Sequence, residues 1–231
     1  MSTIAPADGP TITTSPMIAR TLAKGSVVAA VTTAAAIAVA GFADPGYSAR
    51  SEAISALASV ESESARIMIF GFVTMALTAL AAGTALFLAL KGKAARTGSV
   101  FVIIGGVLTL VAGFARQSCS TLQQSCLDRE TAGTVSAAHV THNLVSLVLF
   151  VLLVAAGFFL AAGLKRNAAA HRHLSRRTRC AAFAALSLMV WFGSGAYGTN
   201  GGLVESAFIL LAFGTPAYLA TRVAGPETKW A

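Results

Sequence analysis

The sequence predicts an all-α protein, a polytopic membrane helix bundle with six transmembrane helices and both termini in the cytoplasm. Of its 231 residues, 55% are hydrophobic and only 11% are charged, and the mean hydropathy is +0.72, which excludes an ordinary water-soluble globule. Six apolar segments are long enough to cross a bilayer, and the basic residues gather on one side of the resulting topology.

Each transmembrane helix is predicted from a mainly apolar run of about 20 residues, because a helix rises about 1.5 Å per residue through a hydrocarbon core about 30 Å thick. The first run, SVVAAVTTAAAIAVAGFA, and the fourth, VSLVLFVLLVAAGFFLAAG, contain no charged residue. Barrel strands would alternate in polarity over about 10 residues, and the sequence has no such alternation. The predicted spans are residues 24–43, 66–90, 98–115, 138–163, 180–198 and 203–222, within a membrane domain at residues 20–223.

The two ends of the chain are predicted to be cytoplasmic tails, at residues 1–19 and 224–231. The first begins MSTIAPADGPTITTSP, which has no helical periodicity, so we expect it to be disordered. A cleaved signal peptide is an alternative for the first span, since Arg20 and Lys24 precede an apolar run that ends in small residues. Cleavage would leave five spans and an external amino terminus.

The orientation follows from the location of positive charge, because cytoplasmic loops retain Lys and Arg. With the amino terminus inside, thirteen of the seventeen basic residues lie on the inner side. The outer segments then hold only four basic residues and seven acids, which are Arg50, Arg66, Arg116, Arg129, Asp44, Glu52, Glu61, Glu63, Asp128, Glu130 and Glu205. The opposite topology would place thirteen cations outside.

The loop between the fourth and fifth spans, KRNAAAHRHLSRRTR, is strongly basic. We expect it to contact anionic lipid head groups, which attract such clusters by about 1 kcal/mol per charge. Membrane lipids are therefore the predicted partners, and nucleic acid is not. His171 and His173 are expected to belong to this solvated surface, since no acid or Cys is close enough in sequence to complete a metal site.

Cys119 and Cys126 both fall in the loop between the third and fourth spans, which the charge pattern places outside, where thiols oxidise. They are predicted to form a disulfide, and closing a loop of about eight residues should stabilise the fold by roughly 2–3 kcal/mol. Cys180, at the inner end of the fifth span, is expected to be a small reduced packing residue.

The candidate functional site is the outer end of the fourth span. Polar residues recur there at steps of three and four and so share one helical face, namely Ser136, His139, His142, Asn143 and Ser146. Lipid cannot satisfy two imidazoles and a carboxamide, so this face should point to the bundle interior or to a water-filled vestibule. Residues of the three outer loops could join it: Asp128 and Glu130, then Asp44, Tyr47, Glu52 and Ser55, and finally Tyr197, Asn200 and Glu205.

Three interpretations of this face remain open. His139 and His142 could form hydrogen bonds between helices and fix their packing. They could instead bind a divalent metal such as zinc, with Asp128 or an acid of the first loop as the oxygen ligand and water completing the sphere. However, HVTH lacks the His spacing and the Glu of a zincin. Contact with a lipid head group, a proton or a substrate is the third. Ser55 is interpreted as a cap or interfacial residue, because no nucleophile elbow surrounds it.

The first outer loop contains DPGYSARSEAISAL, and the second contains an Asp followed by GTVSAAHVTHNL. These segments resemble a bacterial six-span membrane family, domain of unknown function 998. The specific matches are Ser55, Leu57, Asp128, Gly133, Asn143, and either His139 or His142. In that family an Asp-Pro pair and a closer Gly-to-His spacing are usual, whereas Arg129 follows Asp128 here. The resemblance implies a six-helix bundle in the bacterial plasma membrane, distantly similar to the Frag1/DRAM/Sfk1 proteins, and implies no particular activity.

An outer Ser, Asp and His are also similar to the alkaline-ceramidase-like hydrolases, but the fifth and sixth spans lack the distal His pair of those enzymes. The leading hypothesis is therefore a membrane protein that is not demonstrably an enzyme, with a polar outer vestibule that contacts lipid, a small molecule or a partner. The alternatives are a metal-dependent hydrolase at the outer leaflet and a transporter or export accessory. Carriers of ions usually need a charge midway along a span, and Glu205 is the nearest candidate.

Overall fold

The computed structural model describes residues 15–167 and 172–224, and within these ranges all regular secondary structure is helical. Most of the two predicted tails, and His171 of the basic loop, lie outside the described residues. Residues 15–19, which the sequence assigned to the first tail, are helical. The six long helices are α1 (Ser15–Ala43), α2 (Ala65–Ala89), α3 (Lys93–Phe114), α5 (Ala137–Asn167), α6 (Arg172–Gly193) and α7 (Gly201–Ala224).

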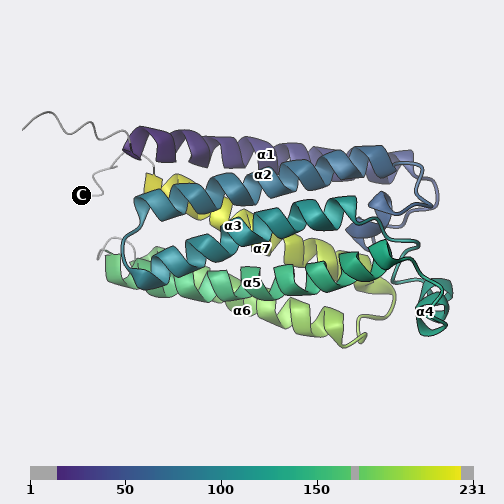
Figure 1. Ribbon diagram of the computed structural model, residues 1–231. Helices are drawn as coiled ribbons and strands as arrows, with labels where there is room; N and C mark the ends of the chain where they lie inside the picture. The colour runs from purple at the N-terminus through teal and green to yellow at the C-terminus, as the bar shows by residue number, and fades with distance from the viewer. Residues whose placement is uncertain (1–14, 168–171, 225–231) are drawn as a thin grey trace, which may run out of the picture.

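The long helices lie side by side and alternate in direction, and the short elements gather at one end of the bundle (Figure 1). These short elements are η1 (Ile54–Ala58), α4 (Gln124–Thr131) and η3 (Gly198–Asn200). We call this the disulfide end, because the Cys119–Cys126 disulfide lies there. The opposite end, where α2 passes into α3 and where α5 ends and α6 begins, is the basic end. It also joins the first and last helices, since Arg20 Nε donates to the carbonyl oxygen of Ala224 at 3.1 Å.

Five of the long helices in the described residues are long and apolar enough to cross a membrane, namely α1, α2, α3, α5 and α7. This composition is that of an integral membrane protein. Each coincides closely with a predicted span. Helix α6 occupies the place of the predicted span 180–198 but fails the same criterion of composition, because four arginines lie in its first half: Arg172, Arg176, Arg177 and Arg179.

Small residues let α3 and α5 approach closely. A Cβ on Gly98 would lie 2.9 Å from the backbone nitrogen of Leu160, and one on Gly163 would lie 2.8 Å from that of Ala95. Close approach through small residues is the usual packing of transmembrane helices, because lipid gives no hydrophobic force between them. This contact aligns the start of α5 with the end of α3, where the candidate site lies.

The loop between α1 and α2 folds back over the disulfide end and is held from two sides. The guanidinium of Arg116 donates to the carbonyl oxygens of Ala58 and Ser59 at 3.0 and 2.6 Å. On the other side, the N–H of Gly202 donates to the carbonyl oxygen of Arg50 at 3.1 Å. The loop carrying η1 therefore closes the bundle over the ends of α3 and α7.

Candidate functional site

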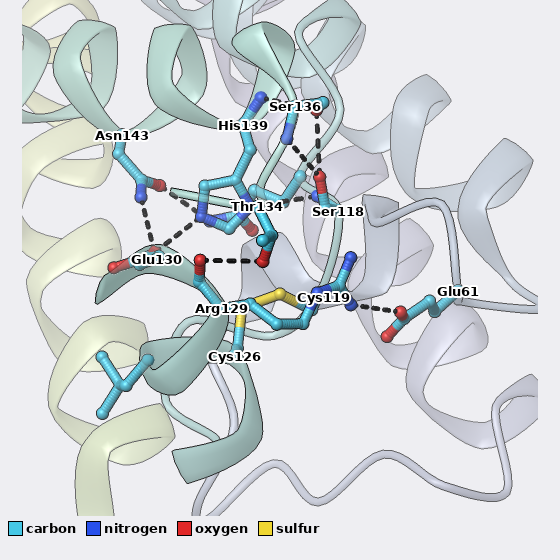
Figure 2. Close-up of a disulfide and its surroundings, with 12 residues drawn as sticks. Glu61, Ser118, Cys119, Cys126, Arg129, Glu130, Thr134, Ser136, His139 and Asn143 are labelled. Atoms are coloured by element: carbon cyan, nitrogen blue, oxygen red, sulfur yellow. Dashed lines mark hydrogen bonds and ion pairs between the residues drawn. A yellow bond between two sulfur atoms is a disulfide. The ribbon is translucent and has the colours of Figure 1, made fainter. Parts of the chain in front are cut away.

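The start of α5 is fixed by two serines. Ser136 Oγ accepts the N–H of His139 at 3.2 Å, which caps the first turn of the helix. Ser118 Oγ donates to Ser136 Oγ at 2.9 Å and accepts the N–H of Ser136 at 3.1 Å. The segment after α3 and the start of α5 are thus joined, as Figure 2 shows.

His139 is fully buried, with 0% of its surface exposed, and both ring nitrogens have partners. Nδ1 accepts the backbone N–H of Ser118 at 3.0 Å, so the ring proton must be on Nε2. Nε2 lies 2.6 Å from Oε1 of Glu130 and donates to it (Figure 2). A backbone amide therefore sets the tautomer of His139, and the His139–Glu130 contact joins a neutral imidazole to a carboxylate.

The same carboxylate begins a chain of side-chain amides. Asn143 Nδ2 donates to Oε1 of Glu130 at 3.2 Å, and Gln117 Nε2 donates to Oδ1 of Asn143 at 3.0 Å. Because a carboxylate only accepts, it fixes which way the Asn143 amide points, and Asn143 in turn fixes Gln117. Oε1 of Gln117 is left buried, and the described part of the chain offers it no hydrogen-bond donor.

His142 has a different role from His139. Its Nδ1 lies 2.8 and 3.1 Å from the carbonyl oxygens of Ala112 and Ala115, at the end of α3, and can only donate to them. These are carbonyls that a helix end leaves without partners of its own. Nε2 is then an acceptor. Packing against the edge of Phe72, with ring centroids 6.0 Å apart, completes the burial of the ring.

The predicted disulfide between Cys119 and Cys126 is confirmed, with a Cα–Cα distance of 5.7 Å. It joins the segment after α3 to α4, the helix that carries Glu130 (Figure 2). Within the described ranges, the candidate metal-binding group of His, Cys and acids is Cys119, Cys126 and His139, with ligand atoms within 4.8 Å of one another. The two sulfurs are bonded to each other, and the nitrogens of His139 are both engaged.

The structure does not bring the predicted metal ligands His139, His142 and Asp128 together. Asp128 is exposed, and its Oδ1 accepts from Gln124 on the preceding turn of the same short helix at 2.9 Å. Residues two apart on a helix point about 200° apart, so Glu130 faces α5 while Asp128 faces away. Glu130 takes the position that the sequence analysis assigned to Asp128.

A partly open cavity of about 340 Å³ lies beside this network, between α5, α6 and the loop that carries η1. We call it the α5 cavity. Its lining contains residues of two kinds, and we call the polar ones the polar wall and the apolar ones the apolar wall. The polar wall is formed by Ser55, Gln117, Thr121, Glu130, His142, Asn143, Ser146, Tyr197 and Glu205, and the apolar wall by Ala53, Leu122, Leu127, Leu147, Phe150, Met189, Phe192 and Gly193.

The model of a family described as "Protein of unknown function (DUF998)" matches residues 27–222. The chain belongs to this family. The resemblance seen in the outer loops is thereby confirmed, and the match extends from α1 to the last turn of α7. No curated protein and no solved structure matches the chain. The chemistry of this DUF998 protein has to be inferred from its own residues.

Several predicted site residues of the DUF998 chain meet at the α5 cavity, and others do not. Ser55, His142, Asn143, Ser146, Tyr197 and Glu205 are on its wall. Asp44, Tyr47 and Glu52 instead line a separate cavity of about 160 Å³. There, burial and then the charges of Glu205 and Glu52 raise the pKa of Tyr47, so its phenol stays protonated. Asn200 accepts from Arg50 Nε at 2.9 Å on the exposed surface.

Gln117 and the apolar wall were not found from the sequence of this DUF998 protein. Gln117 stands alone after a span, with no helical pattern to link it to Asn143. Leu147 and Phe150 are indistinguishable by sequence from lipid-facing residues of the same helix. Glu130, in contrast, was named from the sequence together with Asp128 as a residue that could join this face.

Proposed function

We propose that this DUF998 protein binds a small amphipathic molecule from the outer leaflet of the plasma membrane in the α5 cavity. The observation that carries the proposal is that one cavity is lined by both polar and apolar side chains. Ligand sites of this size commonly combine apolar lining with a few placed polar groups. Along α5 the lining of the cavity extends from His142 to Phe150, about 12 Å at 1.5 Å per residue. That length suits a head group and the first part of a hydrocarbon chain.

The apolar wall continues to the outer surface of the bundle. Leu147, on the long helix α5, belongs to the apolar wall and yet is 58% exposed. In a bilayer, an exposed leucine on a long apolar helix faces hydrocarbon. A molecule dissolved in the membrane can therefore enter from the side and place its polar end against Asn143 and Gln117, which are less exposed than Leu147.

The orientation proposed with this function has six spans, with the disulfide end outside and both termini in the cytoplasm. Helix α5 ends at the basic end and α7 begins at the disulfide end, so α6 must run the length of the bundle between them (Figure 1). The arginines at its start can extend toward lipid head groups. Lys and Arg favour the cytoplasmic side, and a disulfide favours an oxidising compartment.

The hydrolase and transporter alternatives have less support. A metal site built on His139 would have to break its hydrogen bond to Ser118 or to Glu130. Transport usually involves a polar path through the membrane, and the α5 cavity extends only part of the way along α5. Binding of an amphipathic molecule in the α5 cavity requires neither the loss of a His139 hydrogen bond nor a polar path through the membrane.

Native mass spectrometry of the protein, purified in mild detergent, tests the proposal. The wild type should carry a non-covalent amphiphile, and Leu147→Trp, which fills the cavity from its apolar wall, should lose it. Leu144→Trp is the matched control, because Leu144 lies one turn earlier on α5, is 60% exposed and is not on the wall. Equal occupancy in the two variants would refute binding in this cavity.

A further inference from the structure

Several hydrogen-bond acceptors on the polar wall of the α5 cavity have no donor among the described residues. Both hydrogen bonds of the Glu130 side chain go to Oε1, which leaves Oε2 without a donor among the described residues. Nδ1 of His142 carries the ring proton and faces the carbonyls of α3, which leaves Nε2 as an acceptor. Glu205 accepts the N–H of Ile54 through one oxygen only.

Gln117 gives the strongest evidence that a donor is missing. Its side chain is on the cavity wall, the residue is 2% exposed, and Oε1 has no partner within the described chain. Rotating the amide by 180° would not help, because Nε2 would then leave Asn143 Oδ1 facing another oxygen. A buried acceptor without a donor is costly, so the native state should provide one from outside the chain.

The remaining polar groups do not change this balance. Ser55, Thr121, Ser146 and Tyr197 carry hydroxyls, which can donate or accept according to their partner. In the part of the chain that the structure describes, no Lys or Arg lines the cavity. Two carboxyl groups, an imidazole acceptor and a carboxamide oxygen therefore meet an occupant with nothing cationic beside them.

We infer that the amphipathic ligand of the α5 cavity carries a primary ammonium head, which donates to Gln117 Oε1 and the Glu130 carboxylate while its hydrocarbon tail lies on the Leu147–Phe150 wall. This inference rests on the proposed function and names its ligand class. A primary ammonium has three N–H donors, which can reach the free acceptors of Gln117 and Glu130, and a positive charge that complements the Glu130 carboxylate. A phosphate or sulfate head would face two carboxyl groups without a counter-charge, and a bare metal ion would make no use of the apolar wall.

Equilibrium dialysis against the protein in phosphatidylcholine nanodiscs tests the inference with four probes that share a ten-carbon chain. The probes are decylammonium, decyltrimethylammonium, decanol and decyl sulfate. Binding to Leu147→Trp nanodiscs is subtracted from each, so that partition into the lipid does not count. Decylammonium should bind about tenfold or more tightly than decyltrimethylammonium, which keeps the charge but has no N–H to donate.

Two substitutions locate the head group. Glu130→Gln removes the charge but keeps an oxygen that can accept from His139 and Asn143, and it should weaken decylammonium binding about tenfold while leaving decanol unchanged. Asp128→Asn is the matched control, since it removes one charge from the same short helix away from the cavity. Gln117→Met, which keeps the side-chain length, should also weaken decylammonium selectively and gives a second measurement if Glu130→Gln folds poorly.

The outcomes separate the inference from the function on which it rests. If decanol or decyl sulfate binds as tightly as decylammonium and Leu147→Trp abolishes that binding, the cavity binds amphiphiles and the ammonium assignment is wrong. If no probe binds the wild type more than Leu147→Trp, the proposed function fails as well. Equal effects of Glu130→Gln and Asp128→Asn on decylammonium would also overturn the assignment, because they would show only a general effect of charge.

Discussion

The carboxyl group of Glu205, in the first turns of α7, accepts a hydrogen bond from the backbone N–H of Ile54, the first residue of η1. Both groups are buried, and the residues are 151 positions apart in the chain. The contact holds η1 on the wall of the α5 cavity, next to Ser55. Glu205, the acid considered above for ion transport, therefore has a partner in the backbone of the loop between α1 and α2.

Replacing Glu205 should destabilise the protein, and the loss should be larger when the new side chain has no hydrogen-bond acceptor for the N–H of Ile54. Glu205→Leu leaves the N–H of Ile54 buried without a partner, and we expect a loss of about 1–3 kcal/mol in the free energy of unfolding. Glu205→Gln keeps a carbonyl oxygen and should lose less. Thermal unfolding in nanodiscs measures both, with the exposed Glu63→Leu as the control at the same end of the bundle. Equal melting temperatures for Glu205→Leu and wild type would contradict this role.

A methyl group at Gly202 should disrupt the docking of the first loop on α7. A Cβ there would lie 2.6 Å from the carbonyl oxygen of Ala49 and closer still to that of Glu52. Both neighbours are backbone, so the loop would have to move, and we expect Gly202→Ala to lower the melting temperature. Gly25→Ala is the matched control, because nothing lies within 4 Å of its Cβ position. In the middle of α1, that change should be neutral or stabilise by about 0.5–1 kcal/mol.

Composition and charge were sufficient to predict the long helices, because a bilayer imposes length and apolarity on each one separately. Helix α6 does not meet the composition criterion for a membrane span, and the cause is local. Its arginines belong to the basic loop, and the helix continues through them, so residue averages mix a basic half with an apolar half. The short elements η1 and α4 have no such constraint. Their positions depend on long-range contacts, such as that of Ile54 with Glu205, which no periodicity reveals.

Removing the disulfide should destabilise the disulfide end. Cys119→Ser with Cys126→Ser reopens a loop whose closure contributes roughly 2–3 kcal/mol, and α4 would lose its covalent link to the segment after α3. The double variant should unfold at a lower temperature, and it should respond no further to a reducing agent. Cys180→Ser is the control, since Cys180 is exposed and outside the disulfide. If reduction left the wild-type melting temperature unchanged, the disulfide would not be a stabilising element.

His139 and Glu130 should be energetically coupled. His139→Ala leaves the N–H of Ser118 without its acceptor, and Glu130→Ala leaves Nε2–H of His139 without one, so each should cost about 1–3 kcal/mol. The double variant should cost less than the sum of the two, by about 0.5–3 kcal/mol. Asp128→Ala in place of Glu130→Ala provides the control cycle and should be additive with His139→Ala. Additive behaviour of both cycles would show that the contact contributes little.

The face of α5 was predictable, whereas the chemistry of the site was not. Steps of three and four placed His139, His142 and Asn143 on one buried side, because polar groups cannot face lipid. Which acid joined them depended on the rotation of the short helix α4. Glu130 and Asp128 are two residues apart on it and therefore face nearly opposite directions, and the rotation observed points Glu130 at α5. The tautomer of His139 depends on the backbone of Ser118, which carries no sequence signature at all.

The orientation can be measured with added cysteines in a Cys180→Ser background that keeps the disulfide. Four exposed positions serve, two at each end of the bundle: Glu63 and Ala196 at the disulfide end, and Lys93 and Arg177 at the basic end. A membrane-impermeant maleimide applied to intact cells should label Glu63→Cys and Ala196→Cys, and should reach the other two only after the cells are permeabilised. Arg177→Cys and Ala196→Cys flank the apolar half of α6, so this pair decides between six spans and five. Labelling of both from the same side would show that α6 does not cross the membrane. Labelling of Lys93→Cys in intact cells would show that the orientation is the opposite one, with the α5 cavity toward the cytoplasm.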